Sequence, residues 1–347
     1  MINNIFFIFI YLLRSKMESH KFCIAPMIEY TDRHCRYFFR KLTTKAMLYT
    51  EMVVADAIIY GDKEFFLKFD QSEHPIGLQI AGSDPKKLSL ASKLGQDFGY
   101  DEVNLNLGCP SKRVQEGNFG ACMMKDLDLI EQCLLSMKEA VSIPVTIKCR
   151  IGLDNDDPYK VLPELVERVK DIGINTIIIH ARKAILDGLD PKKNREIPPL
   201  DYEIVRLLKR KWPDLKIILN GGLNSIPQAY KEITTGYNDP DGVMMGRAVY
   251  IDPYILKDVD SVFYNKTRRE INRFEVVEQM IPYIEKELQQ GTRLHHITKH
   301  MMGIFHGFRG AKLWRKYLSE ESIKKNFDPN IIKKALNKII DAQKEVA

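Results

Sequence analysis

After Met17, short apolar runs alternate with longer stretches in which apolar residues recur every three or four positions. Runs of the first kind predict buried strands, and stretches of the second kind predict helices that cover them. The stretches 84–98 and 126–141 begin with Asp84-Pro85 and Asp126, residues that are typical of helix N-caps and first turns. The predicted strands are 22–27, 46–52, 76–81, 101–107, 144–149, 174–179, 215–220 and 241–245.

Eight strand-helix units follow one another without a long interruption. An open, doubly wound sheet usually stops at five or six strands, whereas eight units are typical of a closed (β/α)₈ TIM barrel. Such a barrel needs about 250 residues, and the chain has 347. We therefore predict an α/β protein with a TIM barrel over residues 17–255, followed by a small C-terminal domain.

From residue 256 onward the strand pattern gives way to helical stretches with charged faces, which predict a helical domain over 256–347. Gly291 and Gly310 stand where helices end or turn, and Asp328-Pro329 stands at the start of the last helix. Basic residues in this domain are interleaved with Trp314. That pattern suits a surface that contacts RNA phosphates, and it equally suits an ordinary solvated helix face.

The first sixteen residues, MINNIFFIFIYLLRSK, form an apolar leader that is foreign to the barrel pattern. The run is too short to span a bilayer, and its basic residues, Arg14 and Lys16, follow it instead of preceding it. Three interpretations remain: translation starts at Met17, the leader targets the chain or touches a membrane, or it packs on the fold. We expect no stable membrane association.

The composition is that of a globular protein, with 45% apolar and 28% charged residues. It excludes a disordered chain and a membrane-embedded body. The net charge is +6, so the distribution of the charges matters more than their sum. Six cysteines form no CxxC pair, which indicates a reducing compartment. We expect a cytoplasmic monomer without a metal ion.

The last two predicted strands end in residues that suit a phosphate. Functional residues of TIM barrels lie at the C-terminal strand ends, and phosphate is often bound after strands seven and eight. Gly221 and Gly222 follow the seventh strand, and Gly246 and Arg247 follow the eighth. Glycines let the backbone approach an anion, and arginine supplies a bidentate cation. Either pair alone would indicate only a tight turn, but together they favour a phosphate-bearing ligand.

Lys148 and His180 end neighbouring predicted strands, so both side chains can reach the cavity above the barrel. Taken singly, Lys148 could be a surface cation or a Schiff-base nucleophile, and His180 a polar residue without a catalytic role. With Gln79 and a phosphate site they suit a flavin, because a lysine near its N1 and C2 carbonyl stabilises the reduced anion.

Cys109 follows the fourth predicted strand in the sequence LNLGCPS, where Gly108 and Pro110 favour a turn that displays the thiol over the cavity. A thiol is protonated at neutral pH and can act as a general acid, which is compatible with a reduction. A nucleophilic role would require a thiolate, and no histidine stands next to Cys109 in the sequence. Cys122 and Cys133 are better interpreted as buried packing residues.

The strand-end motifs, taken in order, resemble the tRNA-dihydrouridine synthase family. The resemblance extends from about residue 21 to the C-terminus, and the HARKA, PKKNR and WRKYLSE segments are similar to its A subfamily. The segments that carry the resemblance are APM at 25–27, LQIAG at 78–82, NLNLGCPS at 104–111, IKCRIG at 147–152, HARKA at 180–184, PKKNREIPPL at 191–200, LNGG at 219–222 and GR at 246–247.

The resemblance implies an enzyme that binds FMN and takes a hydride from NADPH. The hydride passes to C6 of a tRNA uridine, and Cys109 donates a proton to C5, which yields 5,6-dihydrouridine. The A subfamily points to positions 20 and 20a of the D-loop. By motif matching, FMN would contact Pro26, Met27, Ile28, Gln79, Lys148, His180, Asn220, Gly221, Gly222, Gly246 and Arg247.

The same matching implies that the substrate tRNA contacts Asn106, Lys192 and Arg195 from the barrel, and Lys312 and Arg315 from the helical domain. Lys312 is a departure, because we expect arginine in the family at that position, and a point charge replaces a planar fork. A uridine that leaves its stack to reach the barrel mouth also fits the way RNA bases are presented to enzymes.

Three other functions are compatible with parts of the pattern. A flavin barrel acting on a free pyrimidine, similar to dihydroorotate dehydrogenase, would share the phosphate site but have no use for the basic helical domain. A Schiff-base aldolase would use Lys148 as its nucleophile. A non-catalytic RNA-binding protein would leave the polar strand ends without a purpose.

Overall fold

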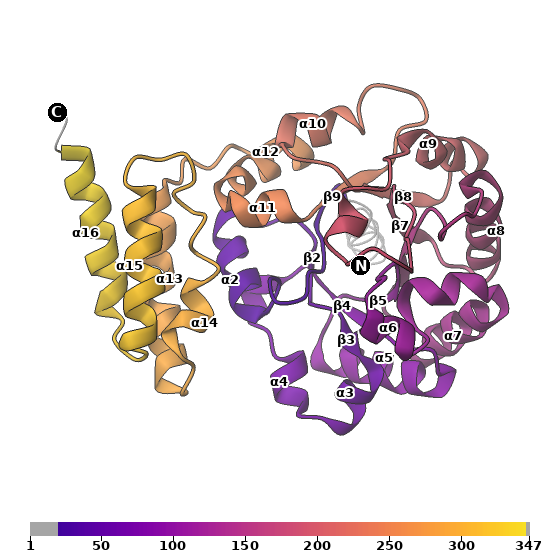
Figure 1. The fold of residues 1–347 in the computed structure, drawn as a ribbon, viewed down its shortest axis with the longest axis horizontal. Helices are drawn as coiled ribbons and strands as arrows, with labels where there is room; N and C mark the ends of the chain where they lie inside the picture. Colours follow the sequence, from indigo (N-terminus) through magenta and orange to yellow (C-terminus); the bar gives the residue numbers. More distant parts are fainter. Residues whose placement is uncertain (1–19, 345–347) are drawn as a thin grey trace, which may run out of the picture.

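The computed structural model describes residues 20–344. At its centre, parallel strands follow the order β1-β9-β8-β7-β6-β5-β4-β2, with β3 beside β4 (Figure 1). Met47, just before β2, closes the ring, because its N–H donates to Phe22 O (2.9 Å) and its carbonyl accepts from Ile24 N (2.8 Å). The strands are β1 (Phe22–Ile24), β2 (Leu48–Tyr49), β3 (Val53–Val54), β4 (Ile76–Ala81), β5 (Glu102–Leu107), β6 (Val145–Arg150), β7 (Thr176–His180), β8 (Lys216–Asn220) and β9 (Gly242–Met245).

Helices connect the strands and surround the ring, so the predicted (β/α)₈ barrel is confirmed (Figure 1). The predicted helices 84–98 and 126–141 are α5 and α7, and the side chains of Asp84 and Asp126 accept backbone N–H bonds at their N-termini. The helices of the barrel are α2 (Arg33–Leu42), α3 (Ala55–Tyr60), α4 (Lys63–Leu67), α5 (Pro85–Phe98), α6 (Lys112–Glu116), α7 (Leu127–Ala140), α8 (Pro158–Asp171), α9 (Tyr202–Lys211), α10 (Ile226–Lys231), α11 (Arg247–Ile251) and α12 (Val259–Tyr264), with short 3₁₀ turns at η1 (Gln71–Glu73), η2 (Gly120–Lys125), η3 (Lys193–Arg195) and η4 (Pro253–Asp258).

The predicted strand 46–52 is shorter than expected and gives way to two short strands, β2 and β3. The break follows Thr50, whose side-chain hydroxyl accepts the N–H of Gln79 at 3.0 Å. In a continuous parallel ladder, the N–H of Gln79 would instead donate to a backbone carbonyl of the neighbouring strand. The chain therefore turns outward between the two strands while both still pair with β4.

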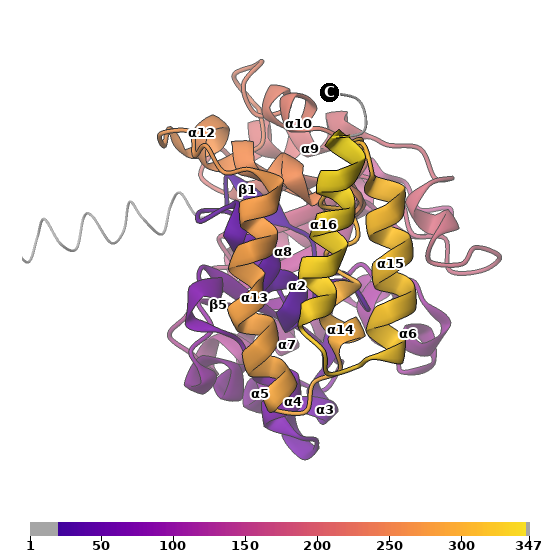
Figure 2. The same ribbon diagram turned by 90° about the vertical axis from the view of Figure 1, so that its left-hand side faces the viewer.

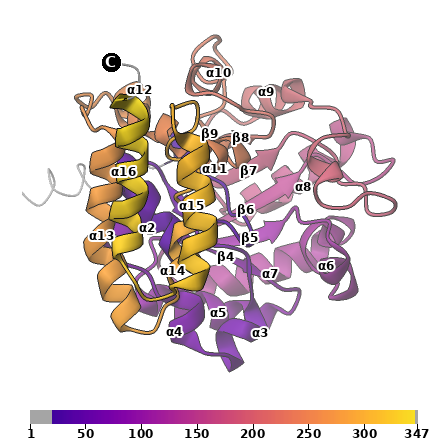
Figure 3. The same ribbon diagram turned by 60° about the vertical axis from the view of Figure 1, so that its left-hand side comes forward.

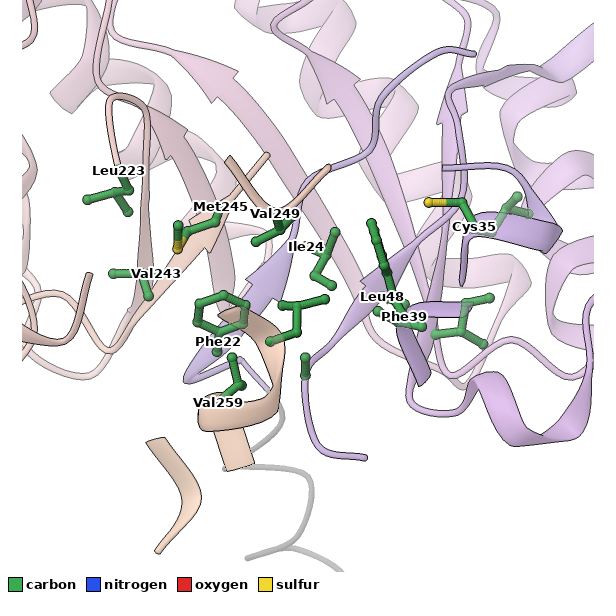
Figure 4. Packing of buried hydrophobic residues seen from close by; sticks show 14 of the residues in the cluster. Phe22, Ile24, Cys35, Phe39, Leu48, Leu223, Val243, Met245, Val249 and Val259 are labelled. Carbon is green, nitrogen blue, oxygen red and sulfur yellow. The ribbon is translucent and has the colours of Figure 1, made fainter. Parts of the chain in front are cut away.

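The main core fills the space between the outer faces of the strands and the helices. Phe22 of β1 lies beside Val259 of α12, and Val243 and Met245 of β9 belong to the same buried cluster (Figure 4). Inside the barrel a second, small apolar cluster contains Cys23, Ala25, Met47, Tyr49, Ile178, Ile218 and Met244. The interior of the barrel is therefore filled by packed side chains.

Four helices after the barrel form a separate group, which Figure 2 shows in front of it. They are α13 (Arg273–Gln289), α14 (Leu294–Thr298), α15 (Ala311–Lys324) and α16 (Asn330–Lys344). This group packs on α2 through a bidentate ion pair between Arg33 and Glu287 (2.6 and 2.5 Å) and through stacked rings of Tyr37 and Tyr283. These contacts fix the position of the helical group relative to the barrel.

The predicted leader at residues 1–16 lies outside the residues that the structure describes. Over residues 20–344, no helix combines the length and the apolar character needed to cross a bilayer. The same residues contain no group of three or more His, Cys, Asp or Glu side chains arranged to hold a metal ion.

Candidate active site

The two glycine turns predicted to hold phosphate lie side by side. Asn220 of β8 is in register with Met244 of β9, so the chain beyond each strand emerges at the same point of the barrel mouth. Gly221 and Gly222 have φ of +112° and +69°, a region that only glycine adopts readily. A Cβ on Gly222 would lie 2.3 Å from Leu200 Cδ1.

Gly246 differs from these two glycines. Its φ is −120°, and a Cβ there would meet Ala25 and Met27 at ordinary contact distances of 3.4 Å. A small side chain would therefore have room at this position, in contrast to Gly222.

Lys148 and His180 meet at the strand ends, as the sequence predicts. Nζ of Lys148 donates to Oδ1 of Asn220 at 3.0 Å, and Nδ2 of Asn220 donates to the carbonyl of Met244 at 2.8 Å. Burial, together with the charge of Arg150, lowers the pKa of Lys148 to about 8. The Asn220 amide thus orients a partly buried ammonium group, and no carboxylate is among its hydrogen-bond partners in the described structure.

His180 lies against Gly221, whose missing Cβ would be 2.8 Å from the ring carbon Cδ2. Burial is the largest influence on the pKa of His180, and neighbouring cations, Arg150 first among them, lower it further below its ordinary value. The imidazole is therefore neutral at neutral pH. Its Nε2 is buried and has no hydrogen-bond partner among the described residues. A buried polar atom of this kind is normally satisfied by a ligand or by water.

Three arginines add to the positive charge of the mouth. Arg150 donates to the carbonyls of Gly108 and Asn194, at 3.1 and 3.0 Å. Burial lowers the pKa of Arg150, Arg182 and Arg195, and neighbouring arginines act in the same direction, Arg247 on Arg182 and Arg195, and Arg195 and Arg182 on Arg150. Nε of both Arg182 and Arg195 is buried and without a partner in the described structure. Crowded cations with unused donors form a site for an anion.

Arg247 is the one predicted phosphate ligand that already has a carboxylate partner. Its Nη1 lies 2.6 Å from Glu196 Oε1, and both side chains are exposed. An exposed ion pair of this kind is worth little and can be exchanged for a phosphate contact. Glu196 stands next to Arg195 in the loop that carries Lys192, so this loop approaches the phosphate turns.

Cys109 stands on the turn after β5, beside the cationic cluster. Its N–H and that of Gly108 donate to Oδ1 of Asn106, at 3.0 and 3.1 Å, so the Asn106 side chain shapes the turn. The carbonyl of Gly108, the residue before Cys109, accepts from Arg150 Nε at 3.1 Å, which places the turn against the cationic cluster. The side chain of Cys109 is only partly buried.

The other cysteines have different surroundings. Cys133 is fully buried in α7, and burial raises the pKa of its thiol to about 12, in keeping with the packing role that the sequence predicts. Cys122 is partly exposed, so the predicted buried position does not hold for it. It lies on η2, next to Ala121, whose N–H donates to the carbonyl of Cys109.

The remaining predicted residues divide between the barrel mouth and the helical group. Pro26, Met27 and Ile28 follow β1, and Ile28 is exposed. Lys192 is exposed on the loop after β7. Lys312 and Arg315 are exposed on α15. Figure 2 places α15 on the same side of the molecule as α6, which follows β5 at the mouth.

The strand-end analysis predicted Asn106 but did not predict Glu102, which lies deeper inside the barrel. Glu102, Asn104 and Asn106 alternate along β5 with apolar residues and are all buried. A period of two places all three on one face of the strand, and that face is the barrel interior. This alternation within the run 101–107 was the available signal.

The fold and the mouth together define a (β/α)₈-barrel protein with a cluster of positively charged side chains and an unpaired buried imidazole at the C-terminal ends of its strands. The family model for dihydrouridine synthase (Dus) matches residues 23–343. The chain therefore belongs to the dihydrouridine synthase family and is a flavin-dependent oxidoreductase that reduces uridine to dihydrouridine in tRNA. This confirms the resemblance found in the sequence and removes the aldolase, the free-pyrimidine reductase and the non-catalytic RNA-binding protein.

Two curated relatives are similar over nearly the whole chain. The tRNA-dihydrouridine(20/20a) synthase of Shewanella oneidensis is 49% identical over 325 residues, which cover 94% of this chain and 96% of the relative. The protein of the same name from Escherichia coli K12 is 48% identical, with coverage of 93% and 92%. A structure of an old yellow enzyme homologue from Zymomonas mobilis has a TM-score of 0.50 at 12% identity, covering 72% of this chain and 90% of the homologue, and shares the barrel fold.

Proposed function

We propose that the enzyme uses FMN and NADPH to reduce uridines 20 and 20a in the D-loop of tRNA. The relatives from Shewanella oneidensis and Escherichia coli carry this position in their names. The observation that carries the cofactor proposal is the group of residues at the strand ends. There, adjacent glycine turns, a partly buried ammonium group and a buried imidazole without a partner converge.

These residues fit FMN. The N–H groups of the turns after β8 and β9 suit a phosphate, and the exchangeable Arg247 stands beside them. The neutral His180 has a free nitrogen for one hydrogen bond with a polar edge of the ring. When bound, the flavin supplies the hydride that reaches C6 of the uridine, with NADPH as the source of electrons. Pro26, Met27, Ile28, Gln79, Lys148, His180, Asn220, Gly221, Gly222, Gly246 and Arg247 would hold it.

Lys148 has a defined electrostatic role in this proposal. Without an anion its pKa is lowered to about 8, mainly by burial. A negatively charged group beside it favours the protonated form and raises that pKa again. Lys148 therefore stabilises a negative charge in the pocket, and the pocket takes up a proton when it gains that charge near pH 8.

Cys109 would complete the reduction. Adding a hydride to C6 places negative charge on C5 and O4 of the uracil, and C5 then needs a proton. The Cys109 thiol donates that proton, and the thiolate left behind recovers one from water. The S–H bond breaks and the C5–H bond forms, while NADPH is oxidised to NADP⁺.

The tRNA would lie across the mouth and along the helical group. Asn106, Lys192 and Arg195 line the mouth, and Arg195 carries a buried nitrogen without a partner. Lys312 and Arg315 extend the positive surface along α15. Binding by such residues depends on phosphate charge more than on sequence, so the uridine that reaches the pocket is selected by tRNA shape.

The test combines the purified protein with tRNA from a strain that lacks dihydrouridine at these positions. The protein should be yellow with FMN that is released on denaturation, and NADPH should support formation of dihydrouridine at positions 20 and 20a. Mapping of the modified positions checks the uridine. A preparation that neither contains nor takes up FMN, or a product at other positions, would refute the corresponding part of the proposal.

A further inference from the structure

A continuous chain of side-chain hydrogen bonds runs inside the barrel from its closed end to the Cys109 turn. At the closed end the carboxylate of Glu102 accepts from Thr146 Oγ1 (2.6 Å), Tyr49 Oη (2.7 Å) and His20 Nε2 (2.7 Å). Burial opposes its ionisation, but His20 and the two hydroxyls lower the pKa of Glu102 below its ordinary value. Glu102 is therefore an ionised acceptor.

From there each link has only one possible direction. Because Thr146 donates to Glu102, its oxygen must accept from Asn104 Nδ2, at 2.8 Å. Asn104 Oδ1 then accepts from Gln79 Nε2, also at 2.8 Å. The next two bonds run from Asn106 Nδ2 to Gln79 Oε1, at 2.8 Å, and from the N–H of Cys109 to Asn106 Oδ1, at 3.0 Å.

Both ends of this chain are fixed. Glu102 can only accept, and the backbone N–H groups of Gly108 and Cys109 can only donate. If one amide between them turned over, it would place N–H against N–H or carbonyl against carbonyl within the buried barrel. A buried donor or acceptor without a partner is costly, so the three amides keep one common orientation.

We propose that Thr146 and Glu102 are positioning residues for the reaction. Together with the backbone N–H groups of Gly108 and Cys109, they fix the orientation in which Gln79 and Asn106 each keep one amide N–H for a ligand, and they support the turn that carries Cys109. This inference rests on the proposed function, because Gln79 is a predicted FMN contact and Asn106 a predicted contact of the substrate. It adds two residues at the far end of the barrel to the machinery.

The decisive comparison is between Thr146→Val and Tyr49→Phe. Each substitution removes one hydroxyl that donates to the same oxygen of Glu102, at 2.6 and 2.7 Å, with little change of shape. Only Thr146→Val also removes the acceptor of Asn104 and so interrupts the chain. Any effect that passes through Glu102 or through barrel stability alone is common to both variants.

We expect Thr146→Val to weaken FMN binding by about tenfold and to lower kcat by about tenfold, the effect of one lost buried hydrogen bond. The flavin absorption bands of the holoenzyme should also shift, while the KM for tRNA stays within about twofold. Tyr49→Phe should resemble the wild type in all these measurements. Thr146→Ser, which keeps the hydroxyl, should restore both flavin affinity and turnover.

Equal behaviour of Thr146→Val and Tyr49→Phe, or no recovery in Thr146→Ser, would overturn the inference. If Thr146→Val does not fold, Asn104→Leu interrupts the chain one link nearer the pocket and is measured in the same way. FMN affinity and the flavin spectrum are measured without tRNA. If the wild type binds FMN but makes no dihydrouridine, the proposed function is refuted. The comparison of FMN affinity between the variants still tests the role of the hydrogen-bond chain.

Discussion

Lys148 at the end of β6 and Asn220 at the end of β8 are joined by a hydrogen bond of 3.0 Å. The bond crosses the barrel mouth, because β7 lies between the two strands. An ammonium group has three N–H donors, so this bond orients Nζ and leaves donors for a ligand. Burial keeps the pKa of Lys148 at about 8, within reach of ordinary experiments.

The first prediction concerns the pH dependence of cofactor binding. The affinity of the flavin-free protein for FMN should decrease as the pH rises through about 8, because Lys148 then loses the charge that attracts an anion. Titration with FMN from pH 6.5 to pH 9.5, followed by flavin fluorescence, measures this. In Lys148→Met the decrease above pH 7.5 should be absent, and the affinity should be low throughout.

Stability of the flavin-free protein should show the opposite trend. The pKa of Lys148 is lower in the folded protein than in the unfolded chain, so between about 8 and the ordinary value the unfolded chain binds more protons. The free energy of unfolding contributed by Lys148 therefore rises with pH over that interval. If urea unfolding of the wild type and Lys148→Met shows the same pH dependence there, Lys148 is not the buried group responsible.

The barrel was predictable because its signals are local. Alternating runs and capping residues such as Asp84 and Asp126 indicate strands and helices within short windows. The interruption after Thr50 was not predictable, because its hydroxyl pairs with Gln79 of the neighbouring strand. In the helical domain, Gly310 stands at the start of α15 with φ of +84°, in keeping with the turn that the sequence predicts there.

In the candidate site, too, local features could be predicted from the sequence and long-range contacts could not. Lys148, His180 and the glycines could be placed at the mouth because the strand ends of a barrel converge. The pairing of Arg247 with Glu196, 51 positions apart, depends on how the loop after β7 folds back. His180 Nε2 and Arg195 Nε are buried without a hydrogen-bond partner in the described structure, and this burial results from several loops that meet at the barrel mouth. No local pattern carries information about contacts of this kind.

The second prediction separates binding from proton transfer. Cys109→Ala should keep FMN and bind tRNA as the wild type does, yet lose turnover by at least about a hundredfold, the usual contribution of a general acid. Single-turnover formation of dihydrouridine from the reduced enzyme measures the chemical step directly. Cys122→Ala is the matched control, because Cys122 is also partly exposed and stands on the segment that touches Cys109. Full activity of Cys109→Ala would remove the acid role.

The third prediction uses the difference between two glycines. Gly222→Ala should destabilise the flavin-free protein by about 1–2 kcal/mol, because an alanine pays this cost at positive φ, and its Cβ would also meet Leu200. Gly246→Ala should lower the melting temperature of the flavin-free protein less than Gly222→Ala does, since its φ is negative and a Cβ would meet its nearest neighbours at 3.4 Å.

Both variants should nevertheless bind FMN more weakly, by about tenfold or more, if both turns approach the phosphate. Isothermal titration of flavin-free protein with FMN measures the affinity, and thermal unfolding gives the stability. Normal FMN affinity in Gly246→Ala would place the phosphate away from the turn after β9.

The fourth prediction concerns the positive surface on α15. The double variant Lys312→Ala and Arg315→Ala should weaken tRNA binding and reduce the dependence of log affinity on log salt by about one for each phosphate that the protein no longer neutralises. FMN affinity should not change, because α15 lies outside the barrel (Figure 3). Binding measured from 50 to 300 mM salt gives the slope.

The control removes the same number of positive charges from a different helix. Lys333 and Lys334 are exposed on α16, in the same helical group, and the double alanine variant also removes two positive charges. A general electrostatic effect would reduce the salt slope equally in both double variants, and α15 would then be an ordinary solvated helix. A reduction confined to the α15 variant assigns the contact to Lys312 and Arg315. Lys312→Arg then tests geometry, because a planar fork in place of a point charge should tighten binding only where a phosphate lies against that residue.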